Sequence, residues 1–74
     1  MEITRNYRIT TDDNLNYIIE RVFVGKAEDM PSIENDVKMI LSTIYVQVTD
    51  SLFIPTSKIK KILYIQPRPH DDYY

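Results

Sequence analysis

The chain has 74 residues, a formal net charge of -2 and a pI near 5.2; 43% of its residues are hydrophobic and 27% are charged. This length supports one hydrophobic core but not two, so we expect a single small domain over residues 1–66 and an extended C-terminal tail over residues 67–74. Proteins that bind nucleic acid through its phosphates usually carry a clear basic excess, which this composition excludes for the chain as a whole.

Cysteine is absent, which excludes disulfides and thiolate metal sites and favours a reducing compartment. No apolar stretch approaches the roughly 20 residues that a membrane helix needs, and the N-terminal residues contain no apolar run of signal-peptide length. We therefore expect a soluble cytoplasmic protein that does not bind membranes. A composition rich in Ile, Tyr and Lys is typical of small proteins from thermophiles or viruses, and a viral protein would lie in the host cytoplasm.

The first predicted element is a half-buried strand over residues 3–10. Ile3, Tyr7 and Ile9 recur with a period of two among polar residues, which is typical of a strand that places one face on the core. Thr11-Asp12-Asp13-Asn14 follows, and side chains of this kind bond their own backbone, which predicts a turn or a helix cap.

The segment from Leu15 to Val24 fits two kinds of element. Its apolar residues recur with helical spacing, and Gly25 could end a helix. Its second half is rich in β-branched and aromatic residues, which favour a strand. We predict a strand that pairs with residues 3–10 as a hairpin, and a helix is the alternative.

A loop and then a short helix are predicted next. Residues 26–32 are the least apolar interior stretch and contain Pro31, which indicates a surface loop. Ser32 is suited to cap a helix that runs through Val37, Ile40, Leu41 and Ile44.

Two strands are predicted between residues 44 and 55. Residues 44–49 and 52–55 flank the polar pair Asp50-Ser51, which predicts an antiparallel hairpin with a two-residue turn. Pro55 cannot donate a ladder hydrogen bond and should end its strand. A tight turn over residues 56–58 then leads into a last apolar strand that ends near residue 65.

Together these elements predict a mainly β fold, a small twisted sheet or partly open barrel of about five strands with one short helix. A helix at residues 15–24 would instead give an α+β fold with a three-stranded sheet and two helices.

The residue types that most catalytic sites need are missing. The one histidine, His70, lies in the predicted tail, so no nucleophile with its base can be identified. Gly25 is the only glycine, which excludes a glycine-rich phosphate loop. His70-Asp71-Asp72 and Asp12-Asp13 are adjacent rather than spaced for coordination. We therefore expect no enzyme activity, no metal site and no cofactor.

A local basic cluster departs from the acidic balance. Lysines could contact phosphates while a tyrosine ring stacks on a base. The candidate nucleic-acid-binding residues are Lys26, Lys58, Lys60, Lys61 and Tyr64. Lysines on an edge strand also discourage edge-to-edge pairing, which explains them without a ligand.

Part of the chain resembles a known family. The segments Ile33–Val37, Tyr45–Asp50 and Phe53–Ile62 are similar to the core of a small, mostly archaeal domain family that is proposed to recognise the cyclic-phosphate ends of processed RNA. That family pairs a tyrosine-rich strand ending in Arg-Gly with a later Ile-Pro-x-His-Arg-Ile segment. In this sequence Val22–Lys26 and Ile54–Ile59 take those places.

The departures from that family's pattern fall on the residues that would bind RNA. Ser57 stands at the place of the histidine, Lys26 and Lys58 at the places of arginines, and Ala27 at the place of a glycine. Lysine keeps the charge but lacks the bidentate fork of arginine, so the resemblance implies weakened or lost end recognition.

The sequence favours a non-enzymatic interaction module that binds a protein partner, as a subunit of an assembly or as an inhibitor. A core this small often gains stability by burying a face against a copy of itself or another chain. Acidic side chains can also meet a basic surface by charge complementarity. The candidate protein-binding residues are Glu28, Asp29, Asp71, Asp72, Tyr73 and Tyr74. The alternative is an RNA-binding module that uses the lysine cluster.

Overall fold

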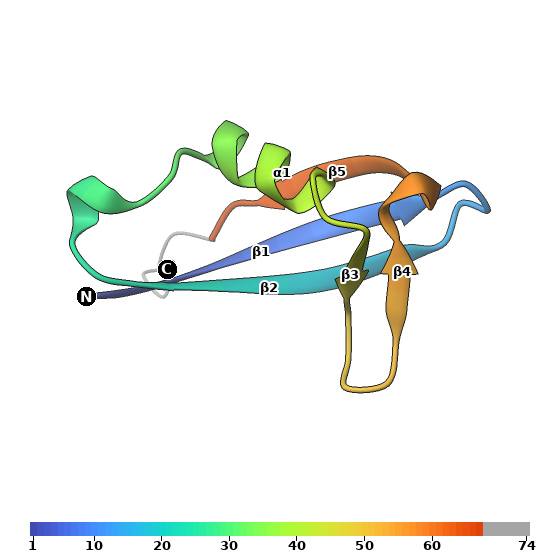
Figure 1. The fold of residues 1–74 in the computed structure, drawn as a ribbon, viewed down its shortest axis with the longest axis horizontal. Coiled ribbons are helices and arrows are strands. Elements are labelled where there is room, and N and C mark those ends of the chain that lie inside the picture. Colours follow the sequence, from blue (N-terminus) through green and yellow to red (C-terminus); the bar gives the residue numbers. More distant parts are fainter. Residues whose placement is uncertain (68–74) are drawn as a thin grey trace, which may run out of the picture.

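The computed structural model describes residues 1–67 and places five strands, one α-helix and two short 3-10 turns along them (Figure 1). In chain order the elements are β1 (Glu2–Thr11), β2 (Asn16–Val24), η1 (Ala27–Asp29), α1 (Ile33–Leu41), β3 (Tyr45–Gln47), β4 (Phe53–Pro55), η2 (Thr56–Lys58) and β5 (Ile59–Ile65). The strands form a three-stranded and a two-stranded sheet, neither of which is closed. The predicted mainly β fold is confirmed. The predicted tail, apart from Pro67, lies outside the described residues.

The three-stranded sheet has the order β2-β1-β5, with both neighbours antiparallel to β1. The segment from Leu15 to Val24 therefore contains a strand, and the helical alternative is wrong. The turn explains the choice: Asn14 adopts a left-handed φ of 65°, and its N–H donates to the Thr11 carbonyl at 2.8 Å. This reverses the chain, so that the β-branched residues of β2 pair with β1.

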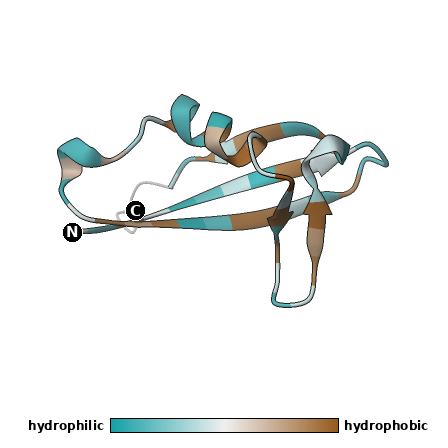
Figure 2. Ribbon diagram, viewed as in Figure 1, coloured by the Kyte–Doolittle hydropathy of each residue, from teal (hydrophilic) through white to brown (hydrophobic). Residues whose placement is uncertain are grey.

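One face of this sheet is covered and the other is open. Side chains alternate across a strand, and the odd-numbered residues of β1 and β2 point to the covered face. Tyr7 and Ile9 are fully buried there, with Ile19 beside them from β2. The even-numbered residues point to the open face and are mostly exposed. Figure 2 shows hydrophobic stretches of β2 on either side of a hydrophilic middle.

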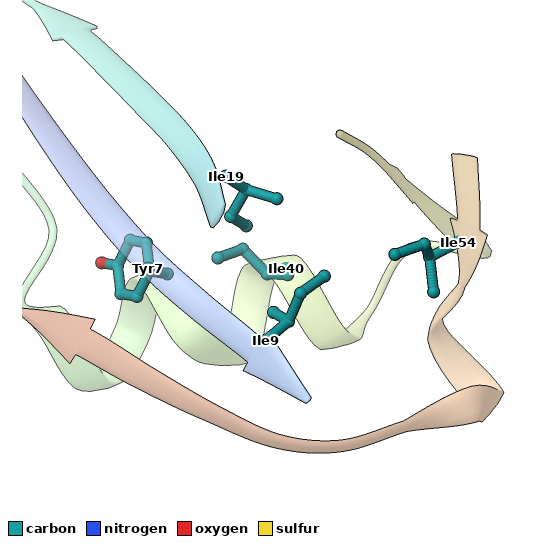
Figure 3. Packing of buried hydrophobic residues seen from close by; sticks show 5 residues of the cluster. All are labelled: Tyr7, Ile9, Ile19, Ile40 and Ile54. Carbon is teal, nitrogen blue, oxygen red and sulfur yellow. The ribbon is translucent and has the colours of Figure 1, made fainter. Parts of the chain in front are cut away.

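The helix α1 lies over the covered face. Ser32 caps it as predicted, because its hydroxyl accepts a hydrogen bond from the Asn35 N–H at 3.1 Å. The helix ends at Leu41 rather than extending to Ile44, since the hydroxyls of Ser42 and Thr43 donate to helix carbonyls at 2.7 Å. Ile40 points from α1 towards Ile9 and Ile19 (Figure 3).

The second sheet is the hairpin of β3 and β4, with Val46 opposite the buried Ile54. Bends occupy residues 48–51, and the Val48 N–H donates to the Leu52 carbonyl at 2.8 Å. The connection is therefore longer than the predicted two-residue turn. Pro55 ends β4 as expected. In Figure 1 the hairpin crosses β2, and its tip projects beyond the outer edge of that strand.

The last strand, β5, pairs with β1 and carries a bulge where Thr10 lies opposite Lys61 and Thr11 opposite Ile59. Lys60, the extra residue, donates to the Asn14 side chain at 2.8 Å, which joins β5 to the β1–β2 turn. Among residues 1–67 no helix has the length and apolar content to cross a membrane.

Candidate functional site

A buried ionic cluster lies between the sheet and α1. The Asp36 carboxylate, fully buried, accepts a hydrogen bond from the Tyr7 hydroxyl at 2.6 Å. Its other oxygen accepts two from Arg21, Nε at 3.0 Å and Nη2 at 2.6 Å. Arg5 Nη1 lies 3.9 Å from the first oxygen. The carboxylate thereby connects the helix to both strands of the first hairpin.

The cluster follows from the strand register. Arg5 and Arg21 are directly opposite each other on the covered face, where two like charges would repel without an anion. Asp36 supplies the anion, and the Phe23 ring lies 5.2 and 5.4 Å from the two guanidinium carbons. Two guanidinium groups face one carboxylate, and the buried Arg5 Nη1 has no hydrogen-bond partner among the described residues. The cluster is left with an excess positive charge.

Sequence reasoning did not identify this cluster. Asp36 lies in the first turn of α1, where acidic residues are common because they interact favourably with the helix dipole. The available signal was the alternation of side chains in the first strand. Arg5 is odd-numbered, like Ile3, Tyr7 and Ile9, and so lies on the same face of the strand. A charged residue in an inward position requires a buried partner, which residue spacing alone does not identify.

Burial and the Asp36 carboxylate raise the pKa of Tyr7 to about 12. Because the folded pKa lies above the ordinary value of 10, this contribution to stability is complete below pH 10 and is lost as the pH rises towards 12. We expect the free energy of unfolding to fall by about 2–3 kcal/mol over this range. Denaturant melts at several pH values measure it. In the Tyr7→Phe variant the free energy of unfolding should fall less steeply between pH 10 and 12. An equal fall in both proteins would refute the assignment of this pH dependence to Tyr7.

The outer edge of β2 is a row of unpaired backbone groups. The Thr11 N–H donates to the Leu15 carbonyl, and the Gly25 N–H to the Met1 carbonyl, so odd-numbered residues of β2 direct their peptide groups at β1. The even-numbered residues direct theirs outward. Among residues 1–67, β2 pairs with no strand except β1. The outward peptide groups are those of Asn16, Ile18, Glu20, Val22 and Val24.

The same even-numbered residues expose apolar side chains on the open face. Ile18 is 52% exposed, Val22 51% and Val24 77%. No lysine or proline, the residues that commonly protect an edge, lies between residues 16 and 24. The edge of β2 is therefore long and unpaired within residues 1–67, apolar at Ile18, Val22 and Val24 and charged at Glu20 and Arg21 in its middle.

A groove runs along this edge on the covered side, with a volume of about 280 Å³. Arg21 borders it and is 31% exposed. The lining also contains Ile19, Glu20, Ile40, Thr43, Tyr45, Val46 and Gln47. The groove thus has one wall from β2 and another from the end of α1 and from β3, whose hairpin projects past the edge (Figure 1).

A second cavity, of about 330 Å³, lies on the other side of the hairpin, between β4 and the β1–β2 turn. Asp12, Asp13 and Lys58 line it together with apolar residues of β4. The Thr11 hydroxyl donates to the Asp13 carboxylate, and this bond holds the pKa of Asp13 below its usual range. Carboxylates at its rim make this cavity unsuited to phosphate.

The structure places only part of the predicted protein-binding set. Glu28 and Asp29 are exposed on η1, shortly after β2 ends. Asp71, Asp72, Tyr73 and Tyr74 lie outside the described residues.

The predicted lysine cluster is divided between the two ends of the sheet. Lys58 and Lys60 lie near the β1–β2 turn, whereas Lys26 follows the far end of β2, nine residues or about 30 Å away. Lys61 is exposed opposite Thr10. Tyr64 is half-buried, with its ring 5.6 Å from that of Tyr7, so this ring lies on the covered face. The structure does not gather these residues on one surface.

Among residues 1–67, no group of three or more His, Cys, Asp or Glu side chains is arranged to hold a metal ion. Comparisons of the chain with protein-family models, with curated proteins and with solved structures found no match. The resemblance to the RNA-end family stays a prediction, and the unpaired edge of β2 with its groove is the candidate site.

Proposed function

We propose that this chain is a non-enzymatic protein-binding module whose partner adds an extended strand to the outer edge of β2. The observation that carries the proposal is the row of unpaired, outward-facing peptide groups along that strand. An added strand gains affinity from main-chain hydrogen bonds and specificity from pockets for alternate side chains. The groove beside Arg21 would supply such a pocket.

The apolar side chains on the open face give further support. A partner strand paired with β2 would set its own side chains beside Ile18, Val22 and Val24, which are about half exposed or more. The hairpin of β3 and β4 would flank the added strand on the covered side. The acidic Glu28 and Asp29, close to the end of β2, would attract a basic segment that flanks that strand.

RNA binding has less support. Lys58 shares its cavity with two carboxylates, and the described lysines are spread over both ends of the sheet. The half-buried Tyr64 ring packs against Tyr7 on the covered face. A phosphate chain would have to contact separated charges, whereas a strand would meet one continuous edge.

The test is selection of a random nine-residue peptide library, displayed on phage, against the immobilised chain. We expect enriched peptides with alternating apolar residues, and binding of a synthetic copy should shift the amide NMR signals of Ile18, Glu20 and Val22. Failure to enrich any peptide, or shifts confined to other elements, would overturn the proposal.

A backbone variant sharpens this test. The Val22 N–H points away from β1, so Val22→Pro removes an outward donor and leaves the β1–β2 ladder intact. We expect the selected peptides to bind Val22→Pro at least about tenfold more weakly. Val22→Thr is the matched control, because it keeps both the N–H and the side-chain shape. Equal binding by the proline variant would mean that the edge is not the site.

A further inference from the structure

We infer that the partner strand carries an acidic side chain that enters the groove beside Arg21, and a basic side chain opposite Glu20 on the open face. The inference rests on the proposed function, because it assumes a strand on the edge of β2. It adds the chemistry of the segment that binds there.

Alternation of side chains assigns the two positions. In an antiparallel pair, directly opposite residues point to the same face. The partner residue opposite Arg21 would point to the covered face, where Arg21 and Ile19 line the groove. The residue opposite Glu20 would point to the open face, where Glu20 is exposed. The two positions are adjacent in the partner, so their opposite charges would be separated by the sheet.

The excess positive charge of the buried cluster favours an acidic side chain in the groove. Two guanidinium groups share the single carboxylate of Asp36, and Arg5 Nη1 is buried without a hydrogen-bond partner. Arg21 alone reaches the groove, and nearly a third of its side chain is exposed. A carboxylate placed there would bond a guanidinium that is already held in position by Asp36 and Phe23.

The groove is large enough and polar enough for that side chain. Its volume of about 280 Å³ exceeds that of a glutamate side chain, and Thr43, Tyr45 and Gln47 lie along its wall. A hydroxyl or an amide from this wall can donate to the second carboxylate oxygen. The apolar Ile19 and Ile40, both almost fully buried, also line the groove and would contact the methylene groups of that side chain.

The exposed Glu20 carboxylate on the open face favours a basic side chain opposite it. Glu20 lies opposite Asn6 of β1 and forms no ion pair within residues 1–67. A lysine or arginine on an added strand would lie directly across from it. Opposite charges at such a position stabilise a strand pair, and like charges destabilise it.

The same charges argue against a second copy of this chain. Two β2 strands in full antiparallel overlap, paired about Glu20, would place Glu20 opposite its own copy. Neither carboxylate would have a cation opposite. This register would therefore be destabilised for a second copy, whereas a different chain can carry complementary charges.

These rules define a probe. An antiparallel partner strand should carry five residues of the types apolar, acidic, basic, apolar and apolar, in that order. They would lie opposite Val22, Arg21, Glu20, Ile19 and Ile18 respectively. The peptide Thr-Thr-Val-Glu-Lys-Ile-Val-Thr-Thr meets this pattern with four flanking threonines. Its matched control replaces the glutamate with glutamine, which keeps the shape and removes the charge.

The experiment is calorimetric titration of both peptides into the intact chain and into its Val22→Pro and Glu20→Lys variants. We expect the glutamine peptide to bind about tenfold more weakly than the glutamate peptide. We expect Glu20→Lys to weaken the parent peptide and to be rescued by a peptide with glutamate in place of its lysine. Both substitutions in the chain are at exposed positions, and thermal melts confirm that the variants fold.

The outcomes separate the two proposals. Equal binding of the two peptides, with loss of binding in Val22→Pro, would overturn the charge pattern and leave strand addition standing. Unchanged binding in Val22→Pro would overturn strand addition itself. A dimeric mass of the chain alone in analytical ultracentrifugation, lost in Val22→Pro, would mean that a second copy occupies the edge and would also overturn the charge pattern.

Discussion

Replacing Asp36 with asparagine should lower the free energy of unfolding by about 3–5 kcal/mol, because it removes the only anion of a buried cluster. The carboxylate is fully buried and accepts hydrogen bonds from Tyr7 and from two nitrogens of Arg21. An amide keeps the size but leaves two opposed guanidinium groups without a counter-charge. Since a domain of this length has a stability on the order of 4–11 kcal/mol, a large part of it would be lost.

Urea denaturation followed by circular dichroism measures this effect. Glu34→Gln is the matched control, since it makes the same chemical change two residues earlier in α1. The Glu34 side chain is 82% exposed and, among residues 1–67, pairs only with Lys38 at 3.6 Å, so a change of no more than about 0.5 kcal/mol is expected. Similar losses in the two variants would show that helix charge, and not the buried cluster, is responsible.

Replacing Ile40 with alanine should cost about 2–4 kcal/mol. Ile40 is the one hydrophobic residue of α1 that is fully enclosed, and it packs with Ile9, Ile19 and Ile54 in the core (Figure 3). These four residues come from the helix, both strands of the first hairpin and β4. Truncation would therefore loosen the helix and the second hairpin from the sheet together.

The control for Ile40 is Met39→Ala on the same helix. Met39 is 49% exposed, and alanine favours the helical state slightly, so only a small change is expected. Thermal unfolding of both variants measures their stability. Hydrogen exchange at the amides of Val46 and Ile54 measures how firmly the β3–β4 hairpin is held against the sheet. If Ile40→Ala lowered stability without faster exchange at those amides, the role of Ile40 in holding the hairpin would be wrong.

Most of the fold could be predicted from local pattern. The alternation around Tyr7 and Ile9 gave the first strand, Ser32 gave the start of the helix, and Pro55 gave the end of β4. These signals depend on a residue and its near neighbours, so the sequence contains them directly. The segment 15–24 was ambiguous, because its apolar spacing fits a helix while its β-branched residues fit a strand. Pairing with β1 decided in favour of the strand.

The candidate site was much less predictable. The sequence indicated acidic residues and lysines as candidate binding residues because of their charges. The candidate site in the structure is instead the unpaired edge of β2. An edge is a property of strand order: in the order β2-β1-β5, no strand among residues 1–67 pairs with the outer side of β2. The hydrophobic pattern of β2 is compatible with a central or an outer position, so no local signal marks it as an edge.

The sequence by itself determined the size of the core, the position of most strands and the start of the helix, because length, side-chain period and capping act over a few residues. Only the tertiary structure decided that Arg5 and Arg21 face each other, that Asp36 of α1 lies between them and Tyr7, and that the groove forms between β2 and β3. The hydrogen bonds of Asp36 with Arg21 and Tyr7 join residues 15 and 29 positions apart in the chain. They follow from strand register and from packing, which depend on the positions of several distant segments at the same time.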